Sequence, residues 1–454
     1  MLLEIVYYIL GGVISFLLTL FSAYSIIENK LRAAILSFII FILFSIGWMA
    51  GQYYLGYAPI VQLVLIAIVL IFGLLFFLPV NRQKIFDYGN VTDKVDESDT
   101  MFAREEYLSG TEKYDKYYLV HPELKAIDDR IRKLPPLLSP GSRFYDEFRS
   151  GMIQVFFRTI GDLTTQVDGP VSSTHDEIDP DGMTKVIKDL AIHLGADEVG
   201  IAQLNPMYVY SHVGRGPEPW GTPINNNHKY AIVFTLEMNY EQVETAPRIG
   251  ITEEAARQYL NSALISTSLA SAIREIGYSA RAHISDSNYQ IMLPPVAVAA
   301  GLGELGRFGY LISKKYGARV RLGGITTDLP LVPDKPIQFG VQKFCEICKK
   351  CATNCPSGAI PYDNRQTIRG INKWPLNVEK CLTYWRLIGT DCGLCMKVCP
   401  FSHPPTLLHN LVRTGINNSS FARHVSNFGD DLFYGKKLRG LDRKSTRLNS
   451  SHRL

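Results

Sequence analysis

The chain has 454 residues, which is enough for two or three domains of ordinary size. Its formal net charge is only +4, and most of that excess lies in residues 441–454. A chain so close to neutral is not expected to bind nucleic acid, because neutralising a phosphate backbone requires clustered Lys and Arg. A hydrophobic content of 46% with 20% charged residues also excludes a disordered chain.

Two long stretches near the N-terminus carry no charged side chain. They are residues 5–27 and residues 33–81, and Gly56 to Pro59 interrupt the second near its middle. Because a helix needs ~20 apolar residues to cross the hydrocarbon core of a bilayer, we predict three spans, near 5–27, 33–55 and 58–80. A signal peptide is the main alternative, but its apolar segment is only ~7–15 residues long.

The flanking charges predict which way the three spans cross the membrane. Lys30 and Arg32 lie between the first and second spans, and Arg82 and Lys84 follow the third. The opposite loop carries no charge, so the positive-inside rule places the N-terminus outside and everything after residue 84 on the cytoplasmic side. The sequence therefore predicts a multi-pass protein of the cell membrane, with the lipid bilayer as one partner.

After the spans the chain turns polar and then alternates between helical and extended patterns. Residues 85–140 have the composition of a tether that leads into a soluble domain. The apolar spacing predicts helices over 183–194, 252–276 and 294–309, and strands over 199–201, 230–236 and 318–327. Thr252 is the expected N-cap of the longest helix, and Gly277 is its expected terminator. These elements predict one core of the α+β class.

All eight cysteines lie between residues 345 and 399, in two groups. The first group is Cys345-x2-Cys348-x2-Cys351-x3-Cys355-Pro356, the bacterial ferredoxin spacing for a 4Fe–4S cluster. The second group is Cys381 followed by Cys392-x2-Cys395-x3-Cys399-Pro400. Since the cysteine before each proline binds the other cluster, the predicted ligand sets are Cys345, Cys348, Cys351 and Cys399 for one cluster, and Cys355, Cys381, Cys392 and Cys395 for the other.

Disulfide bonds and zinc sites account for these cysteines less well. Disulfides are rare on the cytoplasmic side of a membrane. Zinc sites use four tetrahedral ligands and explain neither the paired Cys-Pro endings nor the third cysteine of the first group. We therefore predict a ferredoxin-like module with two 4Fe–4S clusters, which transfers electrons one at a time.

Residues from about 95 to 435 resemble the catalytic subunit of the corrinoid-dependent reductive dehalogenases. The most specific stretch is VRLGGITTDLPLVPDKPIQFGVQKFCEICKKCATNCP at 320–356, and HKYAIVFTLEMNY at 228–240 and AVAAGLGELGRFGYLI at 297–312 are also similar. The resemblance implies a cobamide held base-off in a nitroreductase-like α/β core, with the clusters feeding electrons to cobalt. No Asp-x-His-x-x-Gly cobalamin motif occurs, which fits a family whose corrinoid contacts are dispersed, so the corrinoid-binding residues are not assigned.

Three positions match active-site residues of that family. Tyr259 corresponds to the proton-donating tyrosine, Arg321 to the arginine beside it, and Asn288 to a substrate-side asparagine, with Ser285 as a competitor for that last place. A phenol is protonated at pH 7 and can protonate a carbanion-like carbon, while an adjacent guanidinium stabilises the phenolate. The residues one helical turn from Tyr259 are small, which predicts room for a bulky cofactor: Ala255, Ala256, Ser262 and Ala263.

These inferences divide the chain into five parts. The parts are a membrane anchor at 1–84, a corrinoid-binding catalytic core at 85–335, a ferredoxin-like domain at 336–405, a segment packing on the core at 406–440, and a non-native tail at 441–454. Family members typically carry a twin-arginine leader and pair with a separate anchor, whereas here three predicted spans precede the core.

The resulting hypothesis is a membrane-anchored reductive dehalogenase that acts on a halogenated organic small molecule. Its low-potential electron donor is a quinol, a ferredoxin or a flavoprotein. One alternative is a membrane-bound iron–sulfur electron carrier, which leaves the residues before the clusters without a purpose. The other is a corrinoid enzyme similar to epoxyqueuosine reductase, which acts on tRNA and should carry a more basic surface.

Overall fold

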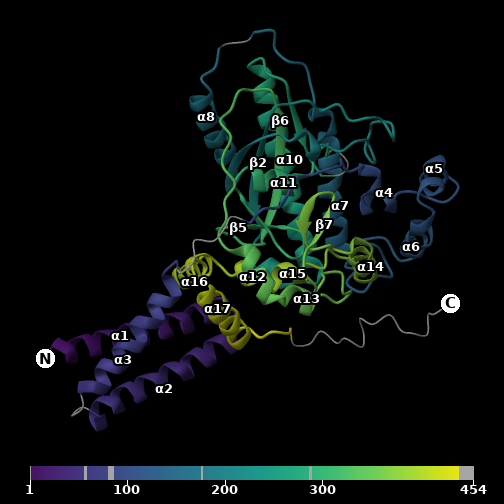
Figure 1. Cartoon of the computed structure of the whole chain (residues 1–454). Helices are drawn as coiled ribbons and strands as arrows, with labels where there is room; N and C mark the ends of the chain where they lie inside the picture. Colours follow the sequence, from purple (N-terminus) through teal and green to yellow (C-terminus); the bar gives the residue numbers. More distant parts are fainter. Residues whose placement is uncertain (1, 56–58, 80–85, 175–176, 286–288, 439–454) are drawn as a thin grey trace. The chain divides into compact units, whose positions relative to one another are not determined.

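The computed structural model separates into two compact units that are interleaved along the chain (Figure 1). The first unit contains residues up to 85 together with 339–348 and 403–439, and the second contains 86–338 and 349–402. The described residues are 2–55, 59–79, 86–174, 177–285 and 289–438. Asn288 and the basic residues Arg82 and Lys84 lie outside them.

Three long apolar helices form most of the first unit. They are α1 (Leu2–Ile27), α2 (Leu31–Leu55) and α3 (Pro59–Phe77), and each is long and apolar enough to cross a membrane. α1 and α2 pack closely because Gly11 leaves space for the Trp48 ring, which stacks on Tyr7 with ring centroids 4.3 Å apart. The Tyr7 hydroxyl donates to the Trp48 carbonyl oxygen at 2.8 Å, so a polar group inside the bundle is satisfied.

Three further helices from distant parts of the chain complete the first unit. They are α12 (Val341–Cys348), α16 (Leu407–Asn418) and α17 (Ser420–Phe433). α16 and α17 contact α3, and α17 also contacts α2 and α12. The helices in the described part of residues 406–440 are thus grouped with the three apolar helices. The sequence-based expectation that this segment packs on the core stays a prediction.

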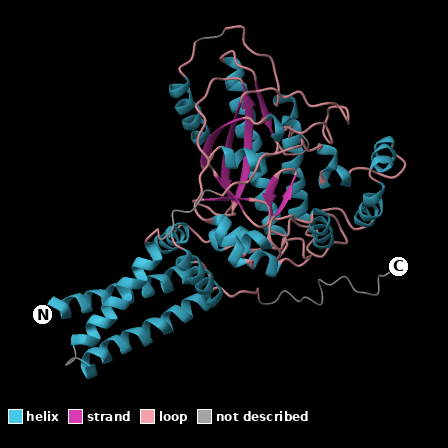
Figure 2. Cartoon of the chain, in the orientation of Figure 1, coloured by secondary structure: helices cyan, strands magenta, loops and turns pink. Residues whose placement is uncertain are grey.

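A four-stranded antiparallel sheet is the centre of the second unit (Figure 2). Its strand order is β1 (Glu198–Gln203), β2 (Tyr230–Glu237), β6 (Val320–Thr327), β3 (Ala280–His283). The central strand β2 is almost wholly buried, as expected for a nearly continuous apolar run covered on both faces. The mixed helix and sheet class is confirmed, while the nitroreductase-like arrangement stays a prediction.

Helices cover both faces of this sheet (Figure 1). One core cluster joins the sheet to α10 (Ile249–Glu275) and α8 (Pro180–His193), and the other joins it to α11 (Leu293–Ala299). The remaining elements of this unit are η1 (Glu97–Asp99), α4 (Met101–Glu105), α5 (Glu112–Val120), α6 (Pro122–Arg132), α7 (Glu147–Asp162), η2 (Leu163–Gln166), η3 (Pro206–Tyr208), α9 (Tyr240–Glu244), β4 (Gly303–Leu305), β5 (Leu311–Ser313), α13 (Lys350–Asn354), β7 (Gln366–Ile368), β8 (Ile371–Lys373), α14 (Val378–Ile388), α15 (Leu394–Lys397) and η4 (Pro400–Ser402).

Two helix predictions differ from the structure in instructive ways. α10 begins three residues before the predicted start, and Thr252 is a buried residue inside it whose hydroxyl accepts a hydrogen bond from the Asp391 backbone N–H. The helix predicted over 294–309 ends at Ala299, and the following glycines form the β4–β5 hairpin. Gly303 permits this because a Cβ there would collide with the Ile312 carbonyl.

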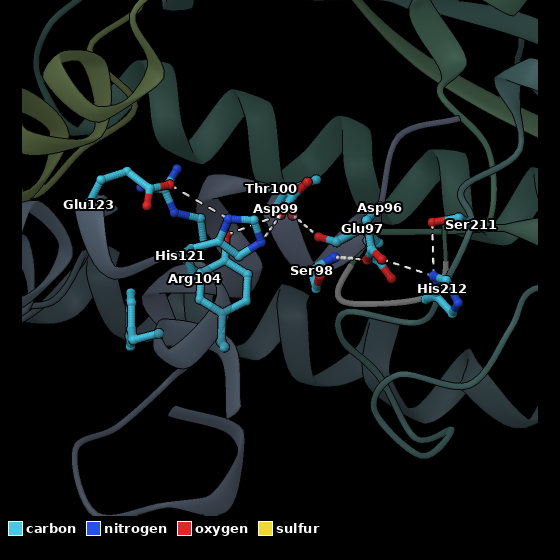
Figure 3. Close-up of polar contacts among 12 residues, drawn as sticks. Asp96, Glu97, Ser98, Asp99, Thr100, Arg104, His121, Glu123, Ser211 and His212 are labelled. Carbon is cyan, nitrogen blue, oxygen red and sulfur yellow. Dashed lines mark hydrogen bonds and ion pairs between the residues drawn. The ribbon is translucent and has the colours of Figure 1, made fainter. Parts of the chain in front are cut away.

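The segment predicted to be a polar tether is instead folded onto the second unit by ion pairs. Asp96 accepts from the Ser98 backbone N–H and lies 2.9 Å from His212 Nδ1, and His121 lies 3.6 Å from Asp99 (Figure 3). Arg104 is buried and pairs with Asp128 on α6 and with Glu379 on α14. Residues 96–132 therefore belong to the second unit.

Candidate active site and iron–sulfur sites

Tyr259 and Arg321 come together because α10 packs against β6. The Arg321 guanidinium carbon lies 5.2 Å from the centroid of the Tyr259 ring, within the range of a cation–π contact. Arg321 Nη2 also lies 3.3 Å from a carboxylate oxygen of Asp391, in the loop before Cys392. The structure thus brings two of the three predicted catalytic residues into contact and adds a carboxylate that the sequence analysis did not single out.

The charges in this group are shielded from water. The side chains of Arg321 and Asp391 are 11% and 17% exposed. Burial acts to lower the pKa of Arg321, but Tyr259 and Asp391 outweigh it and the net pKa is raised, so the guanidinium stays charged. Burial raises the pKa of the Asp391 carboxyl, and Arg321 partly offsets that rise. A fixed positive charge therefore lies beside the phenol of Tyr259.

Two more tyrosines, Tyr289 and Tyr310, interact electrostatically with Tyr259 and Arg321. Burial raises the pKa of both, so both are neutral phenols at ordinary pH. Tyr289 follows the segment that contains Asn288, and Tyr310 lies at the turn between β4 and β5. Neither tyrosine belongs to a sequence motif. Only the packing of distant segments shows that they are neighbours of Tyr259 and Arg321.

The small residues around Tyr259 have a different role from the predicted one. Each of them is at most 1% exposed, so they pack into the protein interior and do not open space for a cofactor: Ala255, Ala256, Ser262 and Ala263. Gly323 on β6 lies against Ser262, which shows that small side chains let α10 approach the sheet. The Ser262 hydroxyl is buried and has no hydrogen-bond partner among the described residues.

Open space borders Arg321. A cavity is lined by four cysteines and by Phe308, Tyr310, Arg321 and Asp391, among others. The four cysteines are Cys355, Cys381, Cys392 and Cys395, the set predicted to bind one cluster. A single cavity thus extends from these thiols to the residues that hold Tyr259.

Local backbone geometry directs these sulfurs inward. Gly393 adopts a left-handed conformation at φ +67°, which reverses the chain between Cys392 and α15, the helix that carries Cys395. The Ala359 N–H lies 3.3 Å from Cys355 Sγ, a contact that favours the thiolate. Burial raises the pKa of the Cys381 thiol to about 12, so a bound cation is needed to keep this group of sulfurs anionic.

The other four cysteines are divided between the two units. Cys345 and Cys348 lie on α12 in the first unit, whereas Cys351 on α13 and Cys399 after α15 lie in the second. Three of them, Cys345, Cys351 and Cys399, are buried. Their assignment to one cluster, and the crossing of Cys355 and Cys399 between clusters, stay predictions.

A second, smaller cavity lies beside Tyr289. Glu97, Arg215 and Arg281 contribute to its lining. Glu97 accepts hydrogen bonds from the backbone N–H groups of Gly214 and Arg215, and burial raises its pKa. Glu97 of η1 therefore lines the same cavity as Tyr289, which interacts electrostatically with Tyr259.

Comparisons with known proteins show what the chain is similar to. A family model described as a 4Fe-4S dicluster domain matches residues 344–403. The tetrachloroethene reductive dehalogenase of Sulfurospirillum multivorans is 35% identical over 312 residues, which cover 60% of this chain and 62% of the relative. That of Desulfitobacterium hafniense is 32% identical over 277 residues, which cover 51% of this chain and 50% of the relative.

A solved structure gives the same class. A reductive dehalogenase whose structure suggests a mechanism for B12-dependent dehalogenation is similar at a TM-score of 0.63 and 27% identity, over 78% of this chain and 49% of that one. The chain spans between about half and about three-fifths of the length of these two curated relatives. The resemblance to reductive dehalogenase catalytic subunits, which are oxidoreductases, is confirmed, as is the iron–sulfur module.

Proposed function

We propose that this protein is a membrane-anchored reductive dehalogenase that replaces a carbon–halogen bond with a carbon–hydrogen bond. The observation that carries the proposal is the Arg321–Tyr259 contact beside the cavity that four cysteines line, in a chain homologous to reductive dehalogenases. The reaction consumes two electrons and one proton and releases a halide ion. Electrons come from a low-potential donor, which is a quinol, a ferredoxin or a flavoprotein.

The residues fit the two kinds of cofactor that this reaction requires. Four buried or half-buried thiols around one cavity are a suitable ligand set for a 4Fe–4S cluster. The unpartnered Arg321 Nε is a buried polar atom beside Tyr259 that a bound group can satisfy. A corrinoid bound beside it supplies a strongly reducing cobalt centre. We therefore assign the corrinoid to the space next to Tyr259 and Arg321, within the nitroreductase-like core predicted from the sequence.

In this proposal the chain itself supplies the proton and its electrostatic support. Tyr259 donates its phenolic proton to the carbon that loses the halogen. Arg321 stabilises the resulting phenolate, because its charge lies 5.2 Å from the ring centre and is shielded from water. Asp391 acts as a positioning residue, since its ion pair fixes the guanidinium. Asn288 is proposed to contact the substrate.

Two measurements on anaerobically purified full-length protein test this function. We expect the absorbance spectrum to contain corrinoid bands together with iron–sulfur absorption, and the reduced protein to release halide from halogenated organic compounds. Iron–sulfur absorption without corrinoid would support the electron-carrier alternative. Corrinoid bands with no halide release across a broad panel would contradict dehalogenation, and reduction of an epoxyqueuosine-containing tRNA stem loop would favour the tRNA-modifying alternative.

A further inference from the structure

The helices α16 and α17, here called the C-terminal hairpin, cap the end of a predicted membrane span. The Ser419 hydroxyl, between the two helices, donates to the Leu75 carbonyl oxygen at 2.6 Å. The Asn418 side-chain amide donates to the Phe77 carbonyl oxygen at 3.2 Å. The last carbonyls of a helix have no partner within the helix, and leaving them unpaired in lipid is costly. The hairpin therefore satisfies polar groups of α3 at its end.

Aromatic contacts place both ends of α17 against the predicted spans. Near its start, Phe421 packs edge-to-face on Phe72 of α3, with ring centroids 5.3 Å apart. At its end, Phe433 packs in the same way on Phe21 of α1, with centroids 4.9 Å apart. α17 thus reaches from one span to another, as the first unit in Figure 1 illustrates.

The positions of these contacts give the depth of α17. α3 has 19 residues and a length of ~28 Å, which just matches the ~30 Å hydrocarbon core of a bilayer. Phe72 precedes the last residue of α3 by five positions, or ~7–8 Å along the axis, and Phe21 precedes the last residue of α1 by six, or ~9 Å. Because both ends of α17 contact the spans at nearly the same distance from their ends, α17 lies roughly parallel to the membrane plane.

The exposed side of α17 carries three large apolar side chains and the polar residue His424. Phe421, Phe428 and Leu432 are 37%, 68% and 37% exposed, and their spacing places them on one side of the helix. The inward residues Ala422 and Arg423 are buried, and Arg423 donates to the Ile416 carbonyl at 2.9 Å. A surface aromatic stripe of this kind, continuous with lipid-facing spans, is typical of a helix that lies in the membrane interface.

We infer that α17 is an interfacial membrane helix whose Phe421, Phe428 and Leu432 side chains contact lipid acyl chains beside the three spans. This inference rests on the proposed membrane anchor. It means that the protein is held in the bilayer by four helices, one of which belongs to the C-terminal part of the chain.

The test uses full-length protein in phosphatidylcholine nanodiscs, with or without bromine on the upper acyl chains as a quencher of tryptophan emission. Three variants each add one tryptophan: Phe428→Trp on α17, Leu70→Trp on α3, and Phe148→Trp on α7. Leu70 and Phe148 are 58% and 76% exposed, so all three sites are accessible. The emission of the wild-type protein in the same nanodiscs is subtracted, which removes its four native tryptophans.

A side chain ~5–10 Å below the membrane surface lies at the depth of the brominated part of the acyl chains. We therefore expect bromine to quench about half of the emission that the Phe428→Trp tryptophan adds. Quenching is also expected at 70, but not at 148. Quenching at 70 without quenching at 428 would overturn the interfacial helix and leave the anchor intact. Absence of quenching at both sites would overturn the anchor and the inference together. Leu432→Trp repeats the measurement if Phe428→Trp lowers the iron content of the purified protein.

Discussion

At the scale of single residues, the proposed function depends on one aromatic ring and the charge beside it. Tyr259→Phe removes only the hydroxyl oxygen and keeps the cation–π contact with Arg321. Since a positioned acid contributes ~10²–10⁴-fold to a rate, we expect halide release to fall by about that range while corrinoid and iron contents stay unchanged. The measurement is halide release from reduced, corrinoid-loaded protein with an artificial electron donor.

A matched control for this variant is Tyr278→Phe, a buried position just beyond the C-terminal end of the same helix. It makes the same chemical change far along α10 from Arg321, so its turnover should equal that of the wild type. Wild-type halide release by Tyr259→Phe would remove this phenol from the mechanism and leave Tyr289 and Tyr310 as the nearest alternatives.

Asp391 provides a second test at this scale. Asp391→Asn keeps the shape of the side chain and removes the charge that pairs with Arg321 at 3.3 Å. We expect turnover to fall about tenfold, which corresponds to ~1.4 kcal/mol of lost transition-state stabilisation. The substrate KM should change less than kcat, because Asp391 acts through Arg321. A variant with unchanged kcat and raised KM would place Asp391 in substrate binding instead.

The sequence singles out Tyr259 and Arg321, which the structure places in contact, but it does not single out Asp391. The first two lie in stretches that resemble a known family, and the cysteines are recognised by spacing alone. The ion pair of Asp391 joins residues 70 positions apart, and its carboxylate is one residue from a cysteine, where no periodicity marks it. Packing of α10 on β6 creates the site, and a linear pattern does not encode that packing.

At the scale of elements, Gly415 on α16 is a point where no side chain fits. A Cβ there would collide with the Phe76 ring of α3, whereas a Cβ at Gly429 on α17 would meet nothing. We expect Gly415→Val to destabilise the protein by ~1–3 kcal/mol, as overpacking does, and Gly429→Ala to be neutral or slightly stabilising. Thermal unfolding in detergent, followed by circular dichroism, measures both. Equal melting temperatures for the two variants would contradict the contact between α16 and α3.

His409 makes the packing of α16 sensitive to pH. It is buried, with Nδ1 3.0 Å from the Pro404 carbonyl oxygen and Nε2 3.0 Å from the Tyr434 hydroxyl, and it also faces His403, Arg413, Glu28 and Asp430. Burial, with His403 and Arg413 nearby, lowers the pKa of His409 to about 3. Between pH ~3 and ~6.5 the unfolded chain therefore binds more protons at His409 than the folded chain does. The contribution of neutral His409 to the free energy of unfolding is complete above pH ~6.5 and declines as the pH falls.

We therefore expect the melting temperature of the wild type to drop more between pH 7.5 and 5.0 than that of His409→Gln, which cannot be protonated. His424→Gln, at an exposed position on α17, is the control and should follow the wild type. Both variants retain the clusters, so acid damage to iron–sulfur centres cancels in the comparison. Parallel melting curves for wild type and His409→Gln would show that His409 does not titrate on unfolding.

Element patterns show what local sequence can and cannot predict. The apolar periodicity of α10 correctly predicts a long helix, because its apolar residues recur at helical spacing along its length. The stretch 294–309 begins with similar apolar spacing, but its glycines at 301 and 303 permit a left-handed turn and a close approach between strands. The packing of residues 407–433 on α3 could not be predicted, because their apolar face fits a core as well as a membrane.

At the scale of the whole molecule, the charge pattern predicts the side on which the catalytic unit lies. Two reporter proteins, one active only in the cytoplasm and one active only outside it, are each inserted after residue 90 and after residue 57. After residue 90 only the cytoplasmic reporter should be active, since Lys30 and Arg32 flank the same end of the spans. The expected result is opposite signals at the two sites, and an active outside reporter after residue 90 would reverse the assigned orientation.

The capping of α3 by Ser419 also sets an order of events during synthesis. The two residues that share this hydrogen bond are 344 positions apart. At ~5–20 residues per second, the ribosome needs about 20–70 s to make the intervening chain. In the proposed topology the span enters the membrane during that interval, while its last carbonyls still lack these partners. The anchor is consequently the first part of the protein to begin folding and among the last to finish, and a chain interrupted before residue 419 leaves it incomplete.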